Sequence, residues 1–363
     1  MYPTSRPFQK TRFLHAYAER HPDLTRSVLT RVTTIGTKRL IVYLTPGYDM
    51  RTGGVIAIAS LYRESIALRH IHGARVALCT VPGDPPFFKY SWFKNHNYIL
   101  DLESVLRDCT QLDYLLIHIP AYTVDRVLDW LTSVSPTLLS KIREIHLNVM
   151  FMNVENIRGK NVSGLKRFGK VSCTTGHEAY TNAAWREALG VPLHRLSCCI
   201  GPECYSLSGY QEKESLLIVS PDPHPIKEKV LEHISQACPD LTIKTIENLS
   251  YEDYLDLARR AKWSLTFGEG LDGYFIEPNL CGGVPFAVFN DRYFTAPFAD
   301  LETIYPSWEV LMEKITADIK RLDEPVAYNE CWQRIYDLVC GLYSTEQFRE
   351  NLRMFYRGEY TFP

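Results

Sequence analysis

Residues 267–285 read FGEGLDGYFIEPNLCGGVP, and this stretch decides how the rest of the chain is interpreted. It follows an apolar run at 263–267, WSLTF, which predicts a buried strand. Three glycines, an aspartate and a glutamate then stand where the strand should give way to a helix. In an open α/β sheet the ligand binds at the carboxyl ends of the strands. A helix that begins there offers free N–H groups and a partial positive charge, which favour a phosphate.

Two glutamates in this stretch, Glu269 and Glu277, are separated by seven residues. With the apolar strand and the Glu-Gly pair that opens the loop, they resemble the E-x7-E motif of retaining GT-B glycosyltransferases, especially family 4. The resemblance implies that Glu269 is catalytic, beside the sugar of a nucleotide-sugar donor, and that Glu277 holds the ribose. A carboxylate suits that role because it accepts from two neighbouring hydroxyls. Gly282 also matches the family pattern, whereas Gly283 is an insertion in it.

The resemblance implies a fold as well as a site. The expected fold class is α/β, of GT-B type: two Rossmann-like doubly wound domains that face a cleft, with C-terminal helices. The predicted elements agree, because strands and helices alternate in two blocks on either side of a Gly/Pro/Ser-rich hinge at 201–210. We expect the following division: 1–37 a basic helical extension, 38–205 the acceptor domain, 206–325 the donor domain, and 326–363 helices that pack back on the acceptor domain.

Further donor-binding residues follow from the same resemblance: Gly53, Gly54, Lys227, Gly270, Asp272, Gly273 and Tyr274. The Gly53-Gly54 pair stands at a helix start after the first predicted strand, where glycines let the backbone approach a ligand closely. The pair is not a G-x-G-x-x-G motif, so a dinucleotide cofactor is not indicated. Pro221 stands where the family has an arginine, so the resemblance leaves Lys227 or the alternative Lys229, assisted by His224, to neutralise the donor diphosphate.

Histidines near strand ends are candidates for the reacting centre. His177 follows Gly176 at a predicted strand-to-helix turn, so its side chain can face the cleft. We take His177 as a second catalytic candidate; the alternative is an ordinary residue at a helix start. His118 also falls near the end of a predicted strand.

Composition and charge limit the class of protein. The 363 residues are 45% hydrophobic and 23% charged, as in a globular protein of about two domains. No apolar run approaches the ~18 residues that span a membrane, and residues 1–6 lack the apolar core of a signal peptide. Residues 1–39 carry eight Lys or Arg and two acids, a charge of +6, so the remainder carries −8. We expect a cytoplasmic protein, with possible peripheral contact of residues 1–39 with the inner face of a membrane.

The expected function is transfer of a sugar from a nucleotide-diphosphate donor to a hydroxyl of a glycan or lipid-linked acceptor, with retained configuration, in cell-surface polysaccharide synthesis. No metal, cofactor or nucleic acid is expected, because no Asp-x-Asp pair or zinc-type Cys/His spacing is present. Two alternatives stay open. One is a sugar-nucleotide epimerase of the same architecture. The other is a nucleotide-binding module or scaffold without catalysis, which Pro221 and Gly283 favour.

Overall fold

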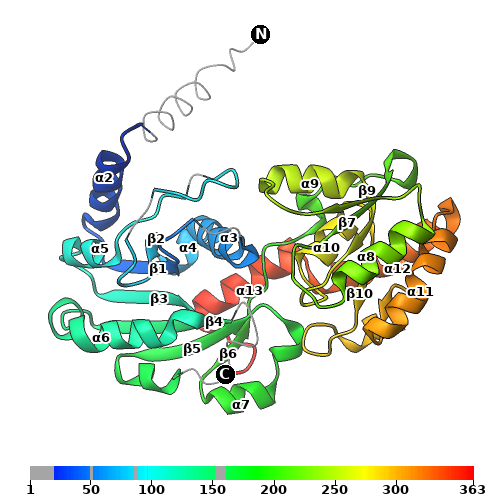
Figure 1. Ribbon diagram of the computed structural model, residues 1–363. Coiled ribbons are helices and arrows are strands. Elements are labelled where there is room, and N and C mark those ends of the chain that lie inside the picture. The colour runs from blue at the N-terminus through cyan, green and yellow to red at the C-terminus, as the bar shows by residue number, and fades with distance from the viewer. Residues whose placement is uncertain (1–19, 50–51, 86–87, 96, 152–160) are drawn as a thin grey trace, which may run out of the picture. The chain divides into compact units, whose positions relative to one another are not determined.

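The structure is a computed structural model and describes residues 20–49, 52–85, 88–95, 97–151 and 161–363 (Figure 1). Residues 1–19 of the predicted helical extension lie outside the described residues. The chain divides into two compact units. Unit 1 holds the residues up to Gly176, Ala183–Leu196 and Asn351–Pro363, and unit 2 holds His177–Asn182 and Ser197–Glu350. This division differs from the expected boundaries at 205 and 326, because the chain changes unit after residues 176, 182, 196 and 350.

Unit 1 is built on a six-stranded sheet whose neighbouring strands all pair in parallel, in the order β2-β1-β3-β4-β5-β6. Its strands are β1 (Arg39–Thr45), β2 (Arg75–Thr80), β3 (Tyr114–Pro120), β4 (Glu144–Phe151), β5 (Lys170–Thr175) and β6 (Leu193–Arg195). Its helices are α2 (Pro22–Thr34), α3 (Gly53–Ala67), α4 (Arg69–His72), α5 (Leu102–Asp108), α6 (Val124–Leu138) and α7 (Ala183–Leu189). The strands are almost continuously buried, as expected for a parallel sheet covered on both faces.

The core of unit 1 is completed from the far end of the chain. Helix α13 (Thr345–Arg357) brings Phe355 against three buried histidines, with ring centroids 5.3 Å from His118, 5.8 Å from His146 and 6.0 Å from His194. His194 Nδ1 accepts from the Thr361 amide at 3.1 Å, while its Nε2 donates to the Asn351 carbonyl at 2.7 Å. One ring nitrogen accepts and the other donates, so the His194 ring is neutral.

Cross-strand pairs continue this polar core. Tyr43 of β1 stands opposite His118 of β3, and their rings stack with centroids 4.1 Å apart. Asn148 of β4, opposite His118 on its other side, donates to His118 Nδ1 at 3.0 Å. The Tyr43 hydroxyl bonds both Ser65 and Tyr356. The stacking of Tyr43 on His118 therefore joins two hydrogen-bonded groups, Tyr43–Ser65–Tyr356 and His118–Asn148.

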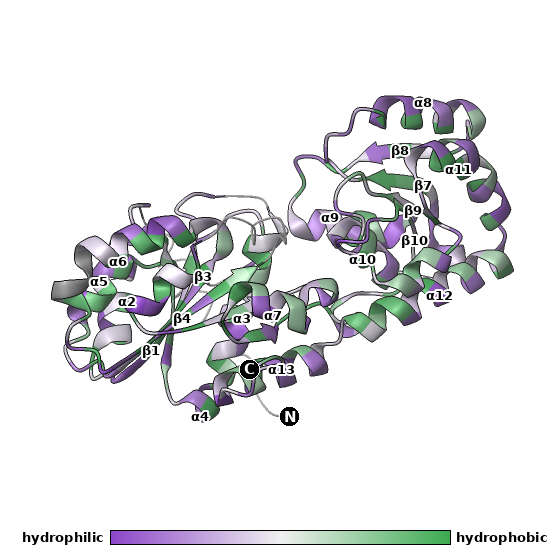
Figure 2. Cartoon of the chain, turned by 90° about the horizontal axis from the view of Figure 1, so that it is seen from below, coloured by the Kyte–Doolittle hydropathy of each residue, from purple (hydrophilic) through white to green (hydrophobic). Residues whose placement is uncertain are grey.

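Unit 2 is built on a five-stranded parallel sheet in the order β11-β10-β9-β7-β8. Its strands are β7 (Glu214–Val219), β8 (Thr242–Thr245), β9 (Ala261–Leu265), β10 (Val284–Val288) and β11 (Ile304–Tyr305). Its helices are α8 (Lys227–Ala237), α9 (Tyr251–Arg260), α10 (Gly273–Leu280), α11 (Trp308–Leu322) and α12 (Pro325–Leu342). Figure 2 shows β7 as predominantly hydrophobic, in agreement with the burial of its last four residues in the core.

Local sequence signals set several helix ends. Gly73 ends α4 with φ +64°, the left-handed conformation that favours glycine. Ser250 caps α9, because its hydroxyl accepts from the Asp253 amide at 3.1 Å. Ser307 caps α11 in the same way. No described helix is both long and apolar enough to cross a bilayer.

Candidate functional site

The candidate site lies in unit 2, in the loop 266–272 between β9 and α10. The loop begins at the carboxyl end of β9 and is held to the neighbouring β7, because the Phe267 amide donates to the Ser220 hydroxyl at 2.9 Å. Strand β9 lies between β7 and β10 in the sheet. The predicted stretch therefore occupies the edge of the sheet at which parallel α/β folds bind ligands.

Glycine is required within this loop. Gly270 has φ +93°, and a Cβ there would lie 2.5 Å from the Phe294 ring. Gly268 is also confined, because a Cβ would lie 2.8 Å from Asp222 Oδ2 and 3.0 Å from Asp272 Oδ2. Two acidic side chains from different loops therefore converge on Gly268.

Asp272 caps helix α10. Its Oδ1 accepts from the amides of Tyr274 and Phe275 at 2.8 and 3.1 Å, and its Oδ2 accepts from the Thr266 hydroxyl at 2.6 Å. Burial raises the pKa of Asp272 to about 7, and the nearby charges of Asp222 and Glu269 add to the effect. The first amides of α10, which we expected to receive a phosphate, therefore donate to a carboxyl of the chain itself.

Glu277 projects from the second turn of α10 and is 8% exposed. Its Oε1 accepts from Tyr251 at 2.6 Å and from Tyr205 at 3.1 Å. Burial raises the pKa of Glu277, while the hydrogen bonds from these tyrosines act in the opposite direction. A buried carboxylate that accepts two hydroxyl protons has the chemistry for binding further hydroxyls through its other oxygen.

More tyrosines surround this carboxylate. The Tyr254 hydroxyl donates to the Gly273 carbonyl at 3.0 Å. The ring of Tyr274, which is half-buried, meets Tyr254 edge-on with centroids 5.7 Å apart. Burial and the charges of Asp222, Asp272 and Glu277 raise the pKa of Tyr274 to about 12. Gly273, Tyr274 and Glu277 of α10 thus each contact a tyrosine of α9.

Lys227 lies at the start of α8, beside the same loop. Its ammonium donates to the carbonyls of Ser220 at 2.6 Å and Asp222 at 3.1 Å, and it lies 5.6 Å from the centroid of the Phe267 ring. A lysine has three N–H donors, so these contacts leave one for a ligand. Asp222 Oδ2 is buried without a hydrogen-bond partner among the described residues.

Glu269 and His177 lie in unit 2 as well. Glu269 is half-buried, and its charge together with that of Glu277 contributes to the raised pKa of Cys198, whose main cause is burial. His177 begins a short 3-10 turn (Glu178–Tyr180), and its ring meets Tyr293 edge-on with centroids 5.3 Å apart. His177 follows β5 in sequence, yet it belongs to unit 2. His118, by contrast, is fully buried in the core of unit 1.

Gly53 and Gly54 belong to unit 1, where they begin α3 at the carboxyl end of β1. Thr52 caps this helix by accepting from the Val55 amide. A Cβ at Gly53 would meet nothing within 4 Å. The pair therefore sits at a helix start as expected, and packing within unit 1 does not require glycine at position 53.

Three tyrosines of the site were missed by the sequence reasoning: Tyr205, Tyr251 and Tyr254. Tyr251 and Tyr254 both follow the Ser250 cap on the first turn of α9, so their spacing was a local signal. Tyr205 was assigned to the hinge, and nothing in its local sequence pairs it with a residue 72 positions away. Among the described residues no group of three or more His, Cys, Asp or Glu could hold a metal ion.

Comparison with known proteins shows which solved structures have a similar fold. No protein-family model and no curated protein matches the sequence. Solved structures match along most of the chain. Anabaena Alr3699/HepE in complex with UDP-glucose is 11% identical, with a TM-score of 0.60, over 88% of this chain and 99% of that chain. Sucrose-phosphate synthase from Thermosynechococcus elongatus is 10% identical, with a TM-score of 0.56, over 88% and 99%.

A third structure, an alpha-glucosyltransferase in complex with UDP and a 13-mer DNA, is 13% identical, with a TM-score of 0.51, over 86% of this chain and 97% of that chain. Likeness at such low identity concerns the fold and not the activity. The two parallel-sheet α/β domains with their helices confirm the predicted fold class. The chain has the GT-B fold of nucleotide-sugar glycosyltransferases.

Proposed function

We propose that this protein is a glycosyltransferase that moves a sugar from a nucleotide-diphosphate donor to a hydroxyl acceptor. One observation carries the proposal: Glu277, at the carboxyl edge of the unit 2 sheet, is a buried carboxylate held by Tyr205 and Tyr251. Burying a carboxylate is costly unless its oxygens are hydrogen-bonded. Here the tyrosines bond Oε1, and Oε2 is the oxygen nearest to where a Gly273 side chain would begin, 3.6 Å away. We assign Oε2 to the ribose hydroxyls of the donor.

The neighbouring groups fit the rest of a donor. Lys227 supplies a cation for the diphosphate, and its ammonium is already fixed by two carbonyls. The half-buried ring of Tyr274 offers an aromatic surface beside the carboxylate. Glu269, from the same loop, is assigned to the sugar. UDP and UDP-glucose are bound by proteins of this fold, which makes uridine the first base to test.

The reaction that fits these residues forms a bond between the acceptor oxygen and the anomeric carbon and breaks the bond to the leaving diphosphate, which takes the acceptor proton. The protein's part is positioning and charge stabilisation. The proposal includes retention of configuration, transfer of a hexosyl or deoxyhexosyl group, and independence from metals. It also includes a glycan or lipid-linked acceptor and a role in polysaccharide synthesis. We further propose that His177 is catalytic and that Gly53 and Gly54 contact the donor. The proposal also includes a cytoplasmic location with peripheral membrane contact.

A second candidate is a nucleotide-binding module without catalysis, and one observation favours it. Asp222 and Asp272 converge on Gly268, close to the carbonyls that hold Lys227, so acidic groups lie where a diphosphate should bind. Two carboxylates near one lysine weaken the attraction for a polyanion. This module would bind a nucleoside or nucleotide without turning over a donor sugar.

The test is a thermal-shift panel with UDP, GDP, dTDP, ADP and CMP in EDTA. A nucleotide at 100 times its dissociation constant should stabilise the protein by ~2.7 kcal/mol. The shift should vanish in Glu277→Gln, which keeps the shape of the side chain, and persist in Glu228→Gln, an exposed residue of α8. Absence of a shift with every nucleotide contradicts both candidates.

Turnover then separates the two candidates. Incubation of the protein with the matching nucleotide-sugar and a pool of acceptors should release free nucleoside diphosphate, and Glu269→Gln should abolish the release while nucleotide binding persists. If the protein binds nucleotide normally but releases no nucleoside diphosphate from any donor, the chain is the non-catalytic module.

A further inference from the structure

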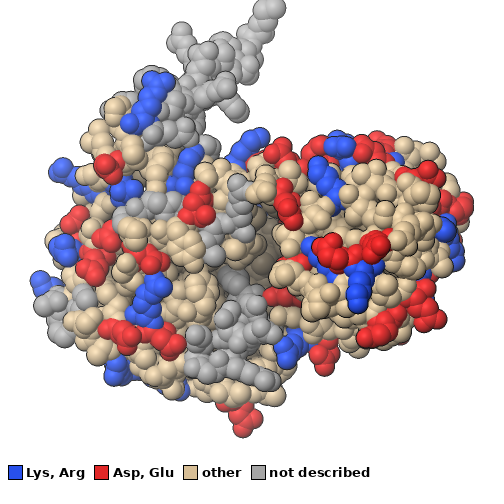
Figure 3. Space-filling view, in the orientation of Figure 1, with Lys and Arg blue, Asp and Glu red and all other residues tan. Residues whose placement is uncertain are grey.

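Two basic segments of the chain border the amino ends of the strands in unit 1. Residues 31–39 end α2 and lead into β1, and residues 69–75 form α4 and lead into β2. Together these segments carry five Lys or Arg and no Asp or Glu. Figure 3 shows Lys and Arg side chains projecting from the surface around α2. Charge of one sign gathered in this way raises the local concentration of anions.

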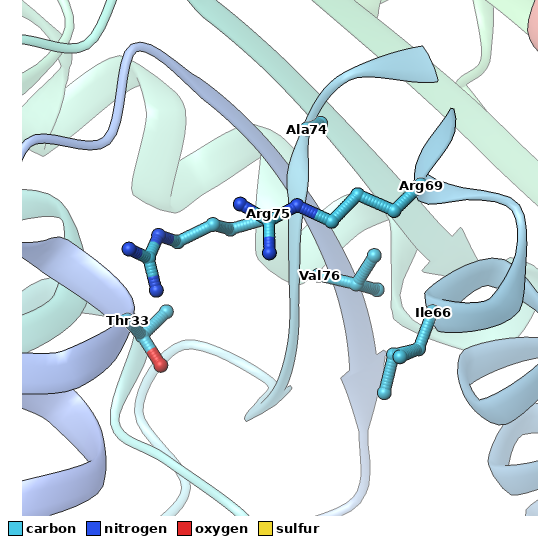
Figure 4. Close-up of a pocket in the computed structure, with 6 residues that line it drawn as sticks. All are labelled: Thr33, Ile66, Arg69, Ala74, Arg75 and Val76. Atoms are coloured by element: carbon cyan, nitrogen blue, oxygen red, sulfur yellow. The ribbon is translucent and has the colours of Figure 1, made fainter. Parts of the chain in front are cut away.

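A cavity of ≈ 160 Å³ lies between these two segments (Figure 4). Its lining comes from α2, α3, α4 and the start of β2, and consists of Thr33, Ile66, Arg69, Ala74, Arg75 and Val76. Figure 4 shows the side chains of Arg69 and Arg75 extending into the same space, with that of Arg75 reaching toward Thr33. A water molecule needs only ~10–15 Å³ of such a cavity, so there is room for an anion of phosphate size and part of an attached group.

The two arginines of the cavity are not neutralised by acids. Arg75 donates to the Val32 carbonyl at 2.7 Å, which uses one of the five N–H groups of its guanidinium. Arg69 is exposed, and within the described part of the chain neither arginine forms an ion pair. Asp108, at the end of α5, is near enough to act against Arg75 on the pKa of Cys109, but it does not pair with Arg75. Both guanidinium groups therefore have donors left for an anionic ligand.

Hydrogen bonds fix the backbone between the two arginines. His72 is buried, and its Nδ1 accepts from the Ala74 amide at 3.0 Å while its Nε2 donates to the Ser65 carbonyl at 2.9 Å. Arg39 Nε donates to the His72 carbonyl at 3.2 Å. The turn from α4 into β2 is therefore held in place before a ligand arrives, so that less conformational freedom is lost on binding.

The cavity is separate from the proposed donor site. All of its lining residues belong to unit 1, whereas Glu277 and Lys227 belong to unit 2. Arg75 and Val76 begin β2, so the cavity lies at the amino end of an edge strand, and ligands of parallel α/β sheets bind at the opposite, carboxyl ends. Thr33 points away from the exposed apolar residues of α2, so that face of the helix takes no part in the cavity.

We propose that this cavity binds the phosphate group of a small soluble phosphomonoester. Each guanidinium can offer two parallel N–H groups to phosphate oxygens, so the two arginines together suit a dianion. Ile66, which is 46% exposed, and Val76 form an apolar border that an organic group attached to the phosphate would cover. Because Thr33 brings α2 into the lining, the ligand would also fasten α2 to the start of β2. The proposal goes beyond sugar transfer and does not depend on an active donor site.

The experiment is calorimetric titration of the full chain at low salt, with inorganic phosphate and phenyl phosphate as the two probes. Phenyl phosphate should bind roughly tenfold more tightly, the factor that ~55 Å² of buried apolar surface supplies. Arg69→Gln should weaken the binding of both probes roughly tenfold or more, because a charge-assisted hydrogen bond is lost. Arg69→Lys should bind with intermediate affinity, since it keeps the charge and loses the bidentate geometry.

Amide hydrogen exchange and matched variants locate the site. Phenyl phosphate should slow exchange in α2 and at the start of β2, and should not do so in Arg69→Gln. Arg143→Gln removes another exposed arginine of unit 1 and should bind both probes like the unmodified chain. Thermal unfolding without a probe should be unchanged in both variants, so that lost binding is not lost folding. Glu277→Gln, which should lose the nucleotide shift, should keep its affinity for phenyl phosphate.

Four results overturn the proposal. The first is that neither probe binds. The second is equal affinity of Arg69→Gln, Arg143→Gln and the unmodified chain, which removes the role of the cavity. The third is slower exchange only in the loop 266–272 and α10, which places the probe in the donor site. The fourth is equal affinity for inorganic phosphate and phenyl phosphate, which makes the cavity a site for free phosphate and not for a phosphomonoester.

Discussion

Unit 1 and unit 2 both bury ionisable side chains, but they bury different types in different places. In unit 1, burial lowers the pKa of His72, His118, His146 and His194, so these rings are neutral at pH 7. In unit 2, burial raises the pKa of Asp272 and Glu277. The histidines lie in the packed core and contact aromatic rings. The carboxyls lie at the carboxyl edge of the sheet, on the first turns of α10.

The difference shows that a perturbed pKa is not in itself a mark of function. His118 is fully buried and bonded to Asn148, as a core residue should be. Glu277 is nearly as buried, yet it stands where a parallel sheet binds ligands, and its Oε1 accepts from both Tyr205 and Tyr251. His118 lies within strand β3, whereas Glu277 lies on the helix that follows the loop after β9, and this second position is the one that supports our proposal of a donor contact.

The strongest way to break the histidine core is to remove Phe355. Phe355→Ala takes away the ring that contacts His118, His146 and His194, and should lower the free energy of unfolding by about 3–5 kcal/mol. Urea denaturation measures this loss. Phe298→Ala, an equally buried site in unit 2, is the control: amide exchange should speed up in β4 for the first variant and in β9 for the second. Faster exchange in β9 alone after Phe355→Ala contradicts the assignment of α13 to the core of unit 1.

Lowering the pH from 7 to 4 should change the stability of the two units in opposite directions, through His146 in unit 1 and Asp272 in unit 2. The pKa of His146 falls to about 4 in the folded state, below its ordinary value of 6.5. The contribution of His146 to the free energy of unfolding is therefore present above pH 6.5 and is lost as the pH falls toward 4. The loss is on the order of 3 kcal/mol. Asp272 has its pKa raised to about 7, so its effect has the other sign: the stability that Asp272 contributes to unit 2 is present below pH 4 and is lost as the pH rises toward 7.

Amide exchange of β4 and β9 between pH 4 and 8, corrected for intrinsic rates, measures this opposition. His146→Gln should flatten the response of unit 1, and Asp272→Asn that of unit 2. Parallel loss of protection in both units at low pH, unchanged by either variant, would show that other groups control the titration.

The smallest expected effect concerns the hydrogen bond from Tyr251 to Glu277. Tyr251→Phe removes the 2.6 Å hydrogen bond to Oε1 and should cost about 1–2 kcal/mol of stability. It should also raise the pKa of Glu277 further, because a bond that lowers this pKa is lost. Carboxyl NMR titration measures the change directly. Tyr274→Phe, which leaves the hydrogen bonds from Tyr205 and Tyr251 to Glu277 in place, should leave that titration curve nearly unchanged. An equal shift in both variants contradicts the specific role of Tyr251.

The sequence allowed the fold to be predicted because its signals are local. The apolar run at 263–267 and the loop after it predict β9 and the start of α10, which the structure contains. Ser250 and Gly73 marked helix ends by side-chain capping and positive φ, which act within a few residues. The short strands β6 and β11 carried no such signal and were not predicted.

The rest depended on contacts between distant residues. Nothing near Tyr205 indicates that it bonds Glu277, and nothing near Gly176 indicates that the next six residues join the other unit. The first amides of α10 were expected to be open, but Asp272 occupies them. A capping aspartate is a local signal, so this last point could have been read from Asp272-Gly273.

The place of residues 351–363 has a consequence for how the protein is made. Phe362 bridges Leu193 of β6, and Phe355 fills the space between histidines whose strands were synthesised some two hundred residues earlier. Chains emerge from the ribosome with the N-terminal end first, at ≈ 5–20 residues per second. The unit whose synthesis begins first is therefore the one whose core closes last. During that interval its open core, lined by His118 and His146, is the surface that a chaperone would have to protect.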